Sequence, residues 1–98
     1  MTLPSTPLGA GDEPRPRTIV VRYEHEIDAL DRVAGILRRQ RVRAEAFTAV
    51  ASHDRATVQA TIMFDSSDKT AARIVSLLER QIGVLAVEDW TSQAKETE

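Results

Sequence analysis

Residues 42–64 read VRAEAFTAVASHDRATVQATIMF and contain two runs of alternating residues separated by a short polar turn. Along residues 42–51, small or apolar side chains at every second position alternate with polar or bulky ones. Residues 57–64 repeat this alternation, and a period of two is typical of a strand with one buried face. The segment therefore predicts a β-hairpin whose turn is formed by residues 52–55.

An amphipathic helix is predicted on each side of this hairpin. Before the hairpin, apolar residues recur at the spacing i, i+3, i+6, i+7 and i+10, which places them on one face of a helix. They are Ile27, Leu30, Val33, Ala34 and Leu37. After the hairpin, the segment DSSD at residues 65–68 is rich in residues that cap helix N-termini, and Gly83 is expected to end the second helix. The apolar face of that helix consists of Ala71, Ile74, Val75, Leu78 and Ile82.

Two further strands complete the pattern. Residues 17–23 are rich in β-branched and aromatic side chains, and residues 84–90 alternate again. The order β-α-β-β-α-β, with right-handed crossovers, predicts a ferredoxin-like α+β fold, in which a four-stranded antiparallel sheet carries both helices on one face. We expect a homodimer, because the face without helices would leave apolar side chains wet in a single copy. The side chains expected on that face include Val20, Phe47 and Val84.

Length and composition restrict the classes of protein to which the chain can belong. Its 98 residues suit one domain, which we expect over residues 17–90, between a flexible leader at residues 1–16 and a flexible tail at residues 91–98. The net charge is -2, no cysteine is present, and no apolar run approaches the ~20 residues of a membrane span. We therefore expect a cytoplasmic protein without disulfides, thiolate metal sites, membrane contact or a secretory signal.

The sequence contains no convincing catalytic or metal-binding group. Its histidines are His25, which lies between two glutamates at the expected strand-to-helix corner, and His53 in the hairpin turn. Polar residues in such turns are more often solvated than catalytic, although functional residues do favour such corners. Asp65 and Asp68 suggest a metal site, but capping of the following helix explains them more simply. We predict no catalytic residue, no metal and no cofactor.

The strongest charged feature is RRQRVR at residues 38–43, which places four arginines within six residues. A solvated helix end, where arginines complement the helix dipole, is the simpler interpretation. The alternative is a surface for an acidic partner, formed by Arg38, Arg39 and Arg41. Nucleic acid is not expected, because ferredoxin-like sheets that bind RNA stack bases on exposed aromatic residues, whereas Tyr23 belongs to the buried face.

Three segments resemble a known family. They are EHEIDALDRVAGIL at residues 24–37, AEAFT at residues 44–48 and LERQIGVLAV at residues 78–87. In order and spacing they are similar to the ACT domain, and in particular to the small regulatory subunit of acetolactate synthase, over residues 19–87. The resemblance implies a non-catalytic subunit that binds and activates the thiamine-diphosphate-dependent large subunit in branched-chain amino-acid biosynthesis.

The resemblance also implies a site for a branched-chain amino acid at a dimer interface. The effector-binding residues that it implies are His25, Ile27, Asp28, Ala29 and Arg43. Feedback-regulated members have Asn, Gly and Asn at the positions of His25, Asp28 and Arg43. The glycine lets helix N-terminal amides receive the effector carboxylate, whereas Asp28 brings its own carboxylate there. We therefore expect weak valine binding or none.

Two alternatives to a synthase subunit remain. One is a free-standing ACT-like sensor that dimerises and binds another small molecule, with no link to acetolactate synthase. The other is a small ferredoxin-like enzyme of the acylphosphatase type. The enzyme is disfavoured, because no glycine-rich loop that could cradle a phosphate accompanies the arginines.

Overall fold

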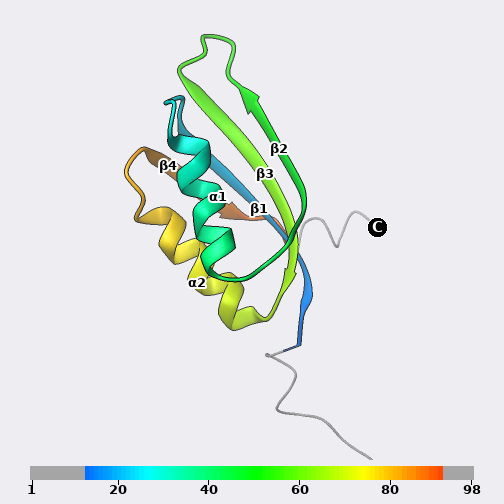
Figure 1. Cartoon of the computed structure of the whole chain (residues 1–98). Helices are drawn as coiled ribbons and strands as arrows, with labels where there is room; N and C mark the ends of the chain where they lie inside the picture. Colours follow the sequence, from blue (N-terminus) through cyan, green and yellow to red (C-terminus); the bar gives the residue numbers. More distant parts are fainter. Residues whose placement is uncertain (1–12, 92–98) are drawn as a thin grey trace, which may run out of the picture.

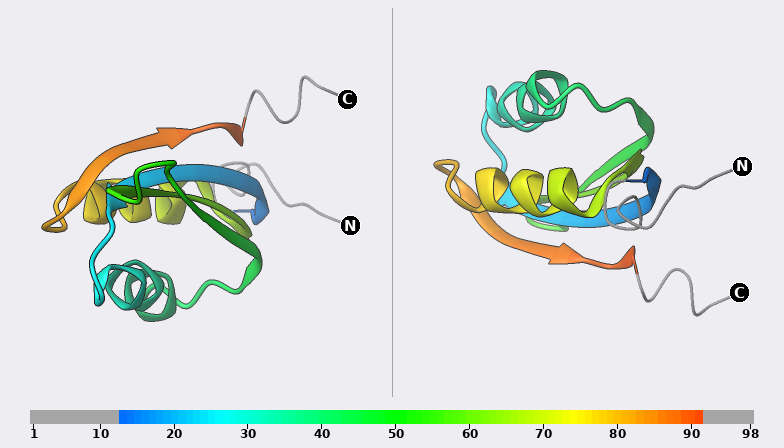
Figure 2. Two further views of the ribbon diagram at one scale, coloured as in Figure 1. Left: turned by 90° about the horizontal axis from the view of Figure 1, so that it is seen from above. Right: turned by 90° about the horizontal axis from the view of Figure 1, so that it is seen from below.

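The computed structural model describes residues 13–91 and contains six elements in the predicted order (Figure 1). The sheet has the strand order β2-β3-β1-β4, and every neighbouring pair is antiparallel. Both helices lie on one face of the sheet (Figure 2), so the predicted ferredoxin-like α+β fold is confirmed. The elements are β1 (Arg15–Glu24), α1 (Ala29–Arg39), β2 (Ala44–Ala51), β3 (Thr57–Ser66), α2 (Asp68–Glu79) and β4 (Val84–Asp89).

The centre of the sheet is an unbroken ladder between β1 and β3, which runs from Arg15 opposite Ser66 to Glu24 opposite Thr57. Alternate side chains of both strands face the helices and are buried. Each large apolar side chain buried in this way stabilises the fold by ~1.5–3 kcal/mol. The core consists of Ile19, Val21, Tyr23, Ala29, Val33, Ile36, Leu37, Val58, Ala60, Ile62, Phe64, Ile74 and Leu78.

The ends of the domain differ slightly from the prediction. Strand β1 begins at Arg15, two residues earlier than expected. Thr91 is held to the sheet, because the Thr18 N–H donates to its hydroxyl oxygen over 3.1 Å. The remaining parts of the expected leader and tail, residues 1–12 and 92–98, lie outside the described residues. Within residues 13–91, neither helix has the length and apolar character that crossing a bilayer requires.

Helix α1 buries only part of the predicted stripe, in which Val33 and Leu37 are in the core as predicted. It begins at Ala29, so Ile27 lies in the preceding turn and is 94% exposed, while Leu30 is 47% exposed. The predicted stripe was wrong at these positions, because the helix is rotated so that a neighbouring row of side chains is buried. That row consists of Ala29, Val33, Ile36 and Leu37.

Helix α2 is shorter than predicted. The Ser67 hydroxyl caps it by accepting a hydrogen bond from the Thr70 N–H, and the helix ends at Glu79. Ile82 was expected on its buried face but follows the helix and is 84% exposed. Gly83 lies in the loop before β4 with φ of 91°, a conformation that favours glycine, so it shapes that loop and does not end the helix directly.

The open face of the sheet is less apolar than predicted. Phe47 and Val84 were expected there, but both lie on the helix side and pack against the core. Phe47 stands opposite the buried Ile62, and a β-bulge in the pairing of β1 with β4 turns Val84 inward. Of the three predicted residues only Val20 lies on the open face, where it is 6% exposed.

A buried arginine fixes one end of the central ladder to helix α2. Arg17 donates from Nε and Nη2 to the Ser66 carbonyl oxygen over 3.1 and 3.0 Å, and also to the Asp68 carboxylate. Arg15 reaches the same carboxylate over 2.8 Å. These hydrogen bonds from Arg15 and Arg17 lower the pKa of Asp68 from its ordinary value of 3.8. A buried guanidinium needs such partners, because an unpaired buried charge is strongly destabilising.

We predict that Asp68→Asn lowers the unfolding temperature at neutral pH. Because the folded-state pKa of Asp68 is lowered, its ionised form contributes stability above pH 3.8, and this contribution is lost as the pH falls through the lowered pKa. The unfolding temperatures of wild type and Asp68→Asn should therefore converge at acid pH. Asp65→Asn is the control, since Asp65 is exposed and forms none of the ion pairs among residues 13–91. Equal stability of Asp68→Asn and wild type at pH 7 would contradict this prediction.

Among residues 13–91, strand β2 forms an edge of the sheet whose outer backbone groups pair with no further strand. Its sequence, AEAFTAVA, contains neither lysine nor proline, which are residues that protect edges against pairing. Val50 on its open-face side is 62% exposed. This edge is therefore the natural place for the expected homodimer to form by pairing of β2 with β2 of a second copy.

We predict a homodimer in light scattering at micromolar concentration, and dissociation of that dimer by Val50→Lys. A lysine on an edge strand disfavours pairing, because its charge would have to be desolvated. Leu85→Lys, on the opposite edge strand β4 where Leu85 is 52% exposed, is the matched control and should leave the dimer intact. A wild-type monomer, or dissociation by the β4 variant alone, would refute pairing through β2.

Candidate functional site

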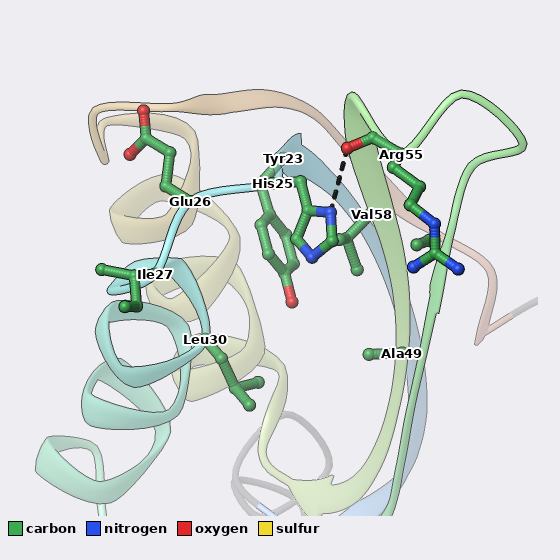
Figure 3. Close-up of a pocket in the computed structure, with 9 residues that line it drawn as sticks. Tyr23, His25, Glu26, Ile27, Leu30, Ala49, Arg55 and Val58 are labelled. Carbon is green, nitrogen blue, oxygen red and sulfur yellow. Dashed lines mark hydrogen bonds between the residues drawn. The ribbon is translucent and has the colours of Figure 1, made fainter.

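The corner between β1 and α1 is tied to the β2–β3 turn by His25. Its backbone N–H donates to the Ala56 carbonyl oxygen over 3.0 Å. Its ring Nδ1 lies 3.0 Å from the Arg55 carbonyl oxygen (Figure 3). A carbonyl oxygen can only accept, so Nδ1 carries a proton, and Nε2 is the nitrogen left to face the space between α1 and the sheet.

The β2–β3 turn is itself ordered by Asp54. Its carboxylate accepts from the Ser52 hydroxyl over 2.7 Å and from the Ala56 N–H over 3.0 Å. These two hydrogen bonds, with Ser52 the stronger cause, lower the pKa of Asp54 from its ordinary value. Arg55, at φ of 64°, is thereby held where its carbonyl meets the His25 ring.

A pocket of about 510 Å³ opens between the start of α1 and the sheet. Figure 2 shows α2 close against the sheet and α1 standing further from it, and the inner face of β2 offers only small side chains at this point. Ile27 and Leu30, the residues left out of the core, form the opposite wall. The pocket is lined by Tyr23, His25, Glu26, Ile27, Leu30, Ala49, Ala51, Arg55 and Val58. We call it the Tyr23 pocket.

Tyr23 supplies a polar atom to this pocket, next to His25 and Arg55. The residue is 3% exposed, and its hydroxyl points into the pocket in the same direction as the free edge of the His25 ring (Figure 3). None of the side-chain hydrogen bonds found within residues 13–91 involves the Tyr23 hydroxyl, although buried tyrosine hydroxyls usually have a partner. Burial raises the pKa of Tyr23, so the hydroxyl is protonated at neutral pH and can donate.

The charges around the Tyr23 pocket favour an anion. Glu26 forms an ion pair with Arg32 over 2.9 Å, and Arg32 is not part of the pocket lining. The negative charge of Glu26 is therefore neutralised by this residue. Arg55 takes part in none of the ion pairs within the described part of the chain. The lining therefore has one uncompensated positive charge.

The structure brings together only some of the predicted effector residues. His25 and Ile27 line the Tyr23 pocket. Ala29, the first residue of α1, is instead buried in the core. Asp28 is the exposed N-cap residue of α1, and its side chain forms no capping hydrogen bond. Arg43 follows the opposite end of α1, so within one chain it is separated from the corner by the length of the helix.

The predicted partner-binding arginines remain exposed at the C-terminal end of α1. Arg38, Arg39 and Arg41 are accessible, and none of them forms an ion pair with another described residue. The tips of Arg38 and Arg39 fold back over the helix near Gly35. This cluster is therefore a free positive surface at the end of the molecule opposite His25.

Tyr23, Leu30 and Arg55 line the pocket but were not predicted to do so from the sequence. The alternation of β1 correctly placed Tyr23 on the buried face, but burial gave no indication that its hydroxyl lacks a partner. Leu30 was assigned to the core, because helical spacing alone does not reveal how far a helix stands from a sheet. A metal site is not supported within residues 13–91, where no group of three or more His, Asp or Glu side chains is placed to hold an ion.

Comparison with known proteins bears on the fold. No family model matches the sequence, and no curated protein matches it. Among solved structures, the ACT domain of GTP pyrophosphokinase from Chlorobium tepidum matches with a TM-score of 0.69 at 13% identity, covering 78% of this chain and 97% of that one. The chain has the ACT fold.

Two structures from Thermotoga maritima are also similar to this ACT-like chain. The acetolactate synthase small subunit matches with a TM-score of 0.69 at 19% identity, over 76% of this chain and 47% of that one. This chain thus spans about half the length of that subunit. An uncharacterized protein matches with a TM-score of 0.65 at 14% identity, over 79% of this chain and 95% of that one. At such identities these similarities establish a shared fold.

Proposed function

We propose that this chain is a non-catalytic regulatory subunit that binds and activates an acetolactate synthase catalytic subunit in branched-chain amino-acid biosynthesis. The observation that carries the proposal is the agreement of two independent similarities. The sequence resembles the small subunit of that enzyme over residues 19–87, and the fold of such a subunit matches 76% of this chain. The catalytic chemistry would belong entirely to the large subunit.

The arginine cluster is the proposed contact with the catalytic subunit. Arg38, Arg39 and Arg41 are exposed together and carry three positive charges without ion-pair partners in residues 13–91. An acidic surface on a partner would be attracted to such a cluster, and exposed charge pairs of this kind mainly set the association rate and its salt dependence. The cluster lies at the far end of α1 from His25, so the partner and an effector could bind together.

We predict that the chain co-purifies with an acetolactate synthase large subunit when the two are expressed together, and that it raises the rate of acetolactate formation. Reversing the charge of Arg38, Arg39 and Arg41 to Glu should weaken retention at low salt. The matched control reverses Arg73 and Arg80, which are also exposed but belong to α2 and its C-cap. No retention of the large subunit and no change in its rate would refute the proposal.

The start of α1 governs the proposed response to valine. In the family that the sequence resembles, this helix N-terminus receives the effector carboxylate. Here the exposed Asp28 occupies the N-cap position with its carboxylate free of any capping hydrogen bond. That negative charge competes with an effector carboxylate for the positive end of the helix dipole.

We predict weak valine binding or none to wild type, and about tenfold tighter binding to Asp28→Gly, since one nearby charge in a partly exposed site is worth ~1 kcal/mol. Calorimetric titration of each purified protein with valine measures this affinity. Asp28→Asn separates the charge from the bulk of the side chain, and Asp31→Asn, one turn along α1, is the control. Low-micromolar valine binding by the wild type would show that Asp28 is no obstacle.

A second candidate function is a free-standing ACT-like sensor that dimerises and has no synthase partner. The observation that favours it is the Tyr23 pocket, which is built by one chain alone and lies beside the α1 N-terminus. The co-purification experiment discriminates between the candidates, because a free-standing sensor should retain no thiamine-diphosphate enzyme.

A further inference from the structure

We infer that the Tyr23 pocket binds a small apolar 2-hydroxy carboxylate, whose polar head meets Tyr23, His25 and Arg55 while its hydrocarbon part lies between α1 and β2. This inference deepens the proposed function by naming the chemical class of an effector. It concerns a site within one chain, built largely from residues other than the helix N-terminal positions that the family resemblance implies.

The apolar walls set the hydrocarbon part of the ligand. Leu30 and Ile27 on one side are 47% and 94% exposed, and water contact with such side chains is unfavourable. Ala49 and Val58 face Leu30 from the sheet (Figure 3). A volume of about 510 Å³ lies within the usual range of small-molecule sites and accommodates a six-carbon acid together with a few waters.

The polar atoms set the head group. Tyr23 is 3% exposed as a whole residue, and its hydroxyl has no partner within residues 13–91 and points into the pocket, so it can donate to a carboxylate oxygen. His25 Nδ1 donates to the Arg55 carbonyl oxygen, so in the neutral imidazole Nε2 is the acceptor and can receive a hydrogen bond from a ligand hydroxyl. A group that both accepts and donates, as a 2-hydroxy carboxylate does, satisfies both side chains.

The charge of the pocket selects a monoanion over a zwitterion. Arg55 is the uncompensated charge of the lining, because Glu26 is engaged by Arg32 at 2.9 Å. A carboxylate is attracted by that charge, whereas the ammonium group of an amino acid is repelled by it. The pocket should therefore prefer a hydroxy acid to the amino acid with the same side chain.

The experiment is calorimetric titration of the full chain with 2-hydroxy-4-methylpentanoate, compared with leucine and with 4-methylpentanoate, which lacks the hydroxyl. We expect the hydroxy acid to bind most tightly. Removing the ligand hydroxyl, or the protein hydroxyl in Tyr23→Phe, should weaken binding about tenfold, as expected for one hydrogen bond in a buried site. Unchanged unfolding temperature of Tyr23→Phe shows that the variant is folded.

Two matched pairs of variants locate the site. Arg55→Gln removes the charge but keeps the carbonyl that holds His25, and its control is Arg73→Gln, an exposed arginine on α2. Ala49→Leu fills the pocket from the inner face of β2, and its control is Thr48→Leu on the opposite face of that strand. Only the first member of each pair should weaken binding.

No binding of the hydroxy acid at millimolar concentration, equal or tighter binding of leucine, or unchanged affinity in Tyr23→Phe and Ala49→Leu would each overturn the inference. The experiments distinguish failure of this inference from failure of the proposed synthase role. A chain that binds the hydroxy acid but retains no synthase large subunit loses the synthase role and keeps the pocket. A chain that retains the large subunit but binds no hydroxy acid loses the pocket alone.

Discussion

The central ladder between β1 and β3 is the constraint on which the rest of the molecule depends. It runs without interruption from Arg15 opposite Ser66 to Glu24 opposite Thr57, and both of its ends are tied to other elements. At one end Arg17 links the ladder to the start of α2, and at the other His25 links it to the β2–β3 turn. Because a one-residue slip would turn every core side chain outward, this register also fixes which residues meet at the corner.

The Tyr23 pocket exists because the first turn of α1 contributes only the small side chain of Ala29 to the core. The buried row of that helix begins at Ala29, and the large side chains Ile36 and Leu37 lie in its second half. Near its N-terminus the helix therefore has little to insert toward β2, where Ala49 and Ala51 are also small. A region with few apolar contacts can host a ligand at a lower cost in stability than the centre of the core.

Opposite charges are separated around the corner. Asp28 places a carboxylate without a capping hydrogen bond at the N-terminal end of α1. Arg55 brings an uncompensated positive charge to the pocket between α1 and the sheet. The two positions lie on different elements, so they can act on a ligand independently. An effector that avoids Asp28 and reaches Arg55 would be bound within one chain, and the arginine cluster at the other end of α1 would remain open to a partner.

The sequence by itself determined the order of the elements, the strand faces of β1 and β3 and the ferredoxin-like topology, because periods of two and 3.6 and right-handed crossovers are local or chiral properties of the chain. It also placed His25 at the corner. Only the tertiary structure decided that Ile27 and Ile82 stay exposed, that Phe47 and Val84 face the core, and that Arg17 is buried. These outcomes depend on helix rotation, on a β-bulge and on the distance between α1 and the sheet. Such rigid-body relations arise from packing of segments far apart in the chain, and no local pattern encodes them.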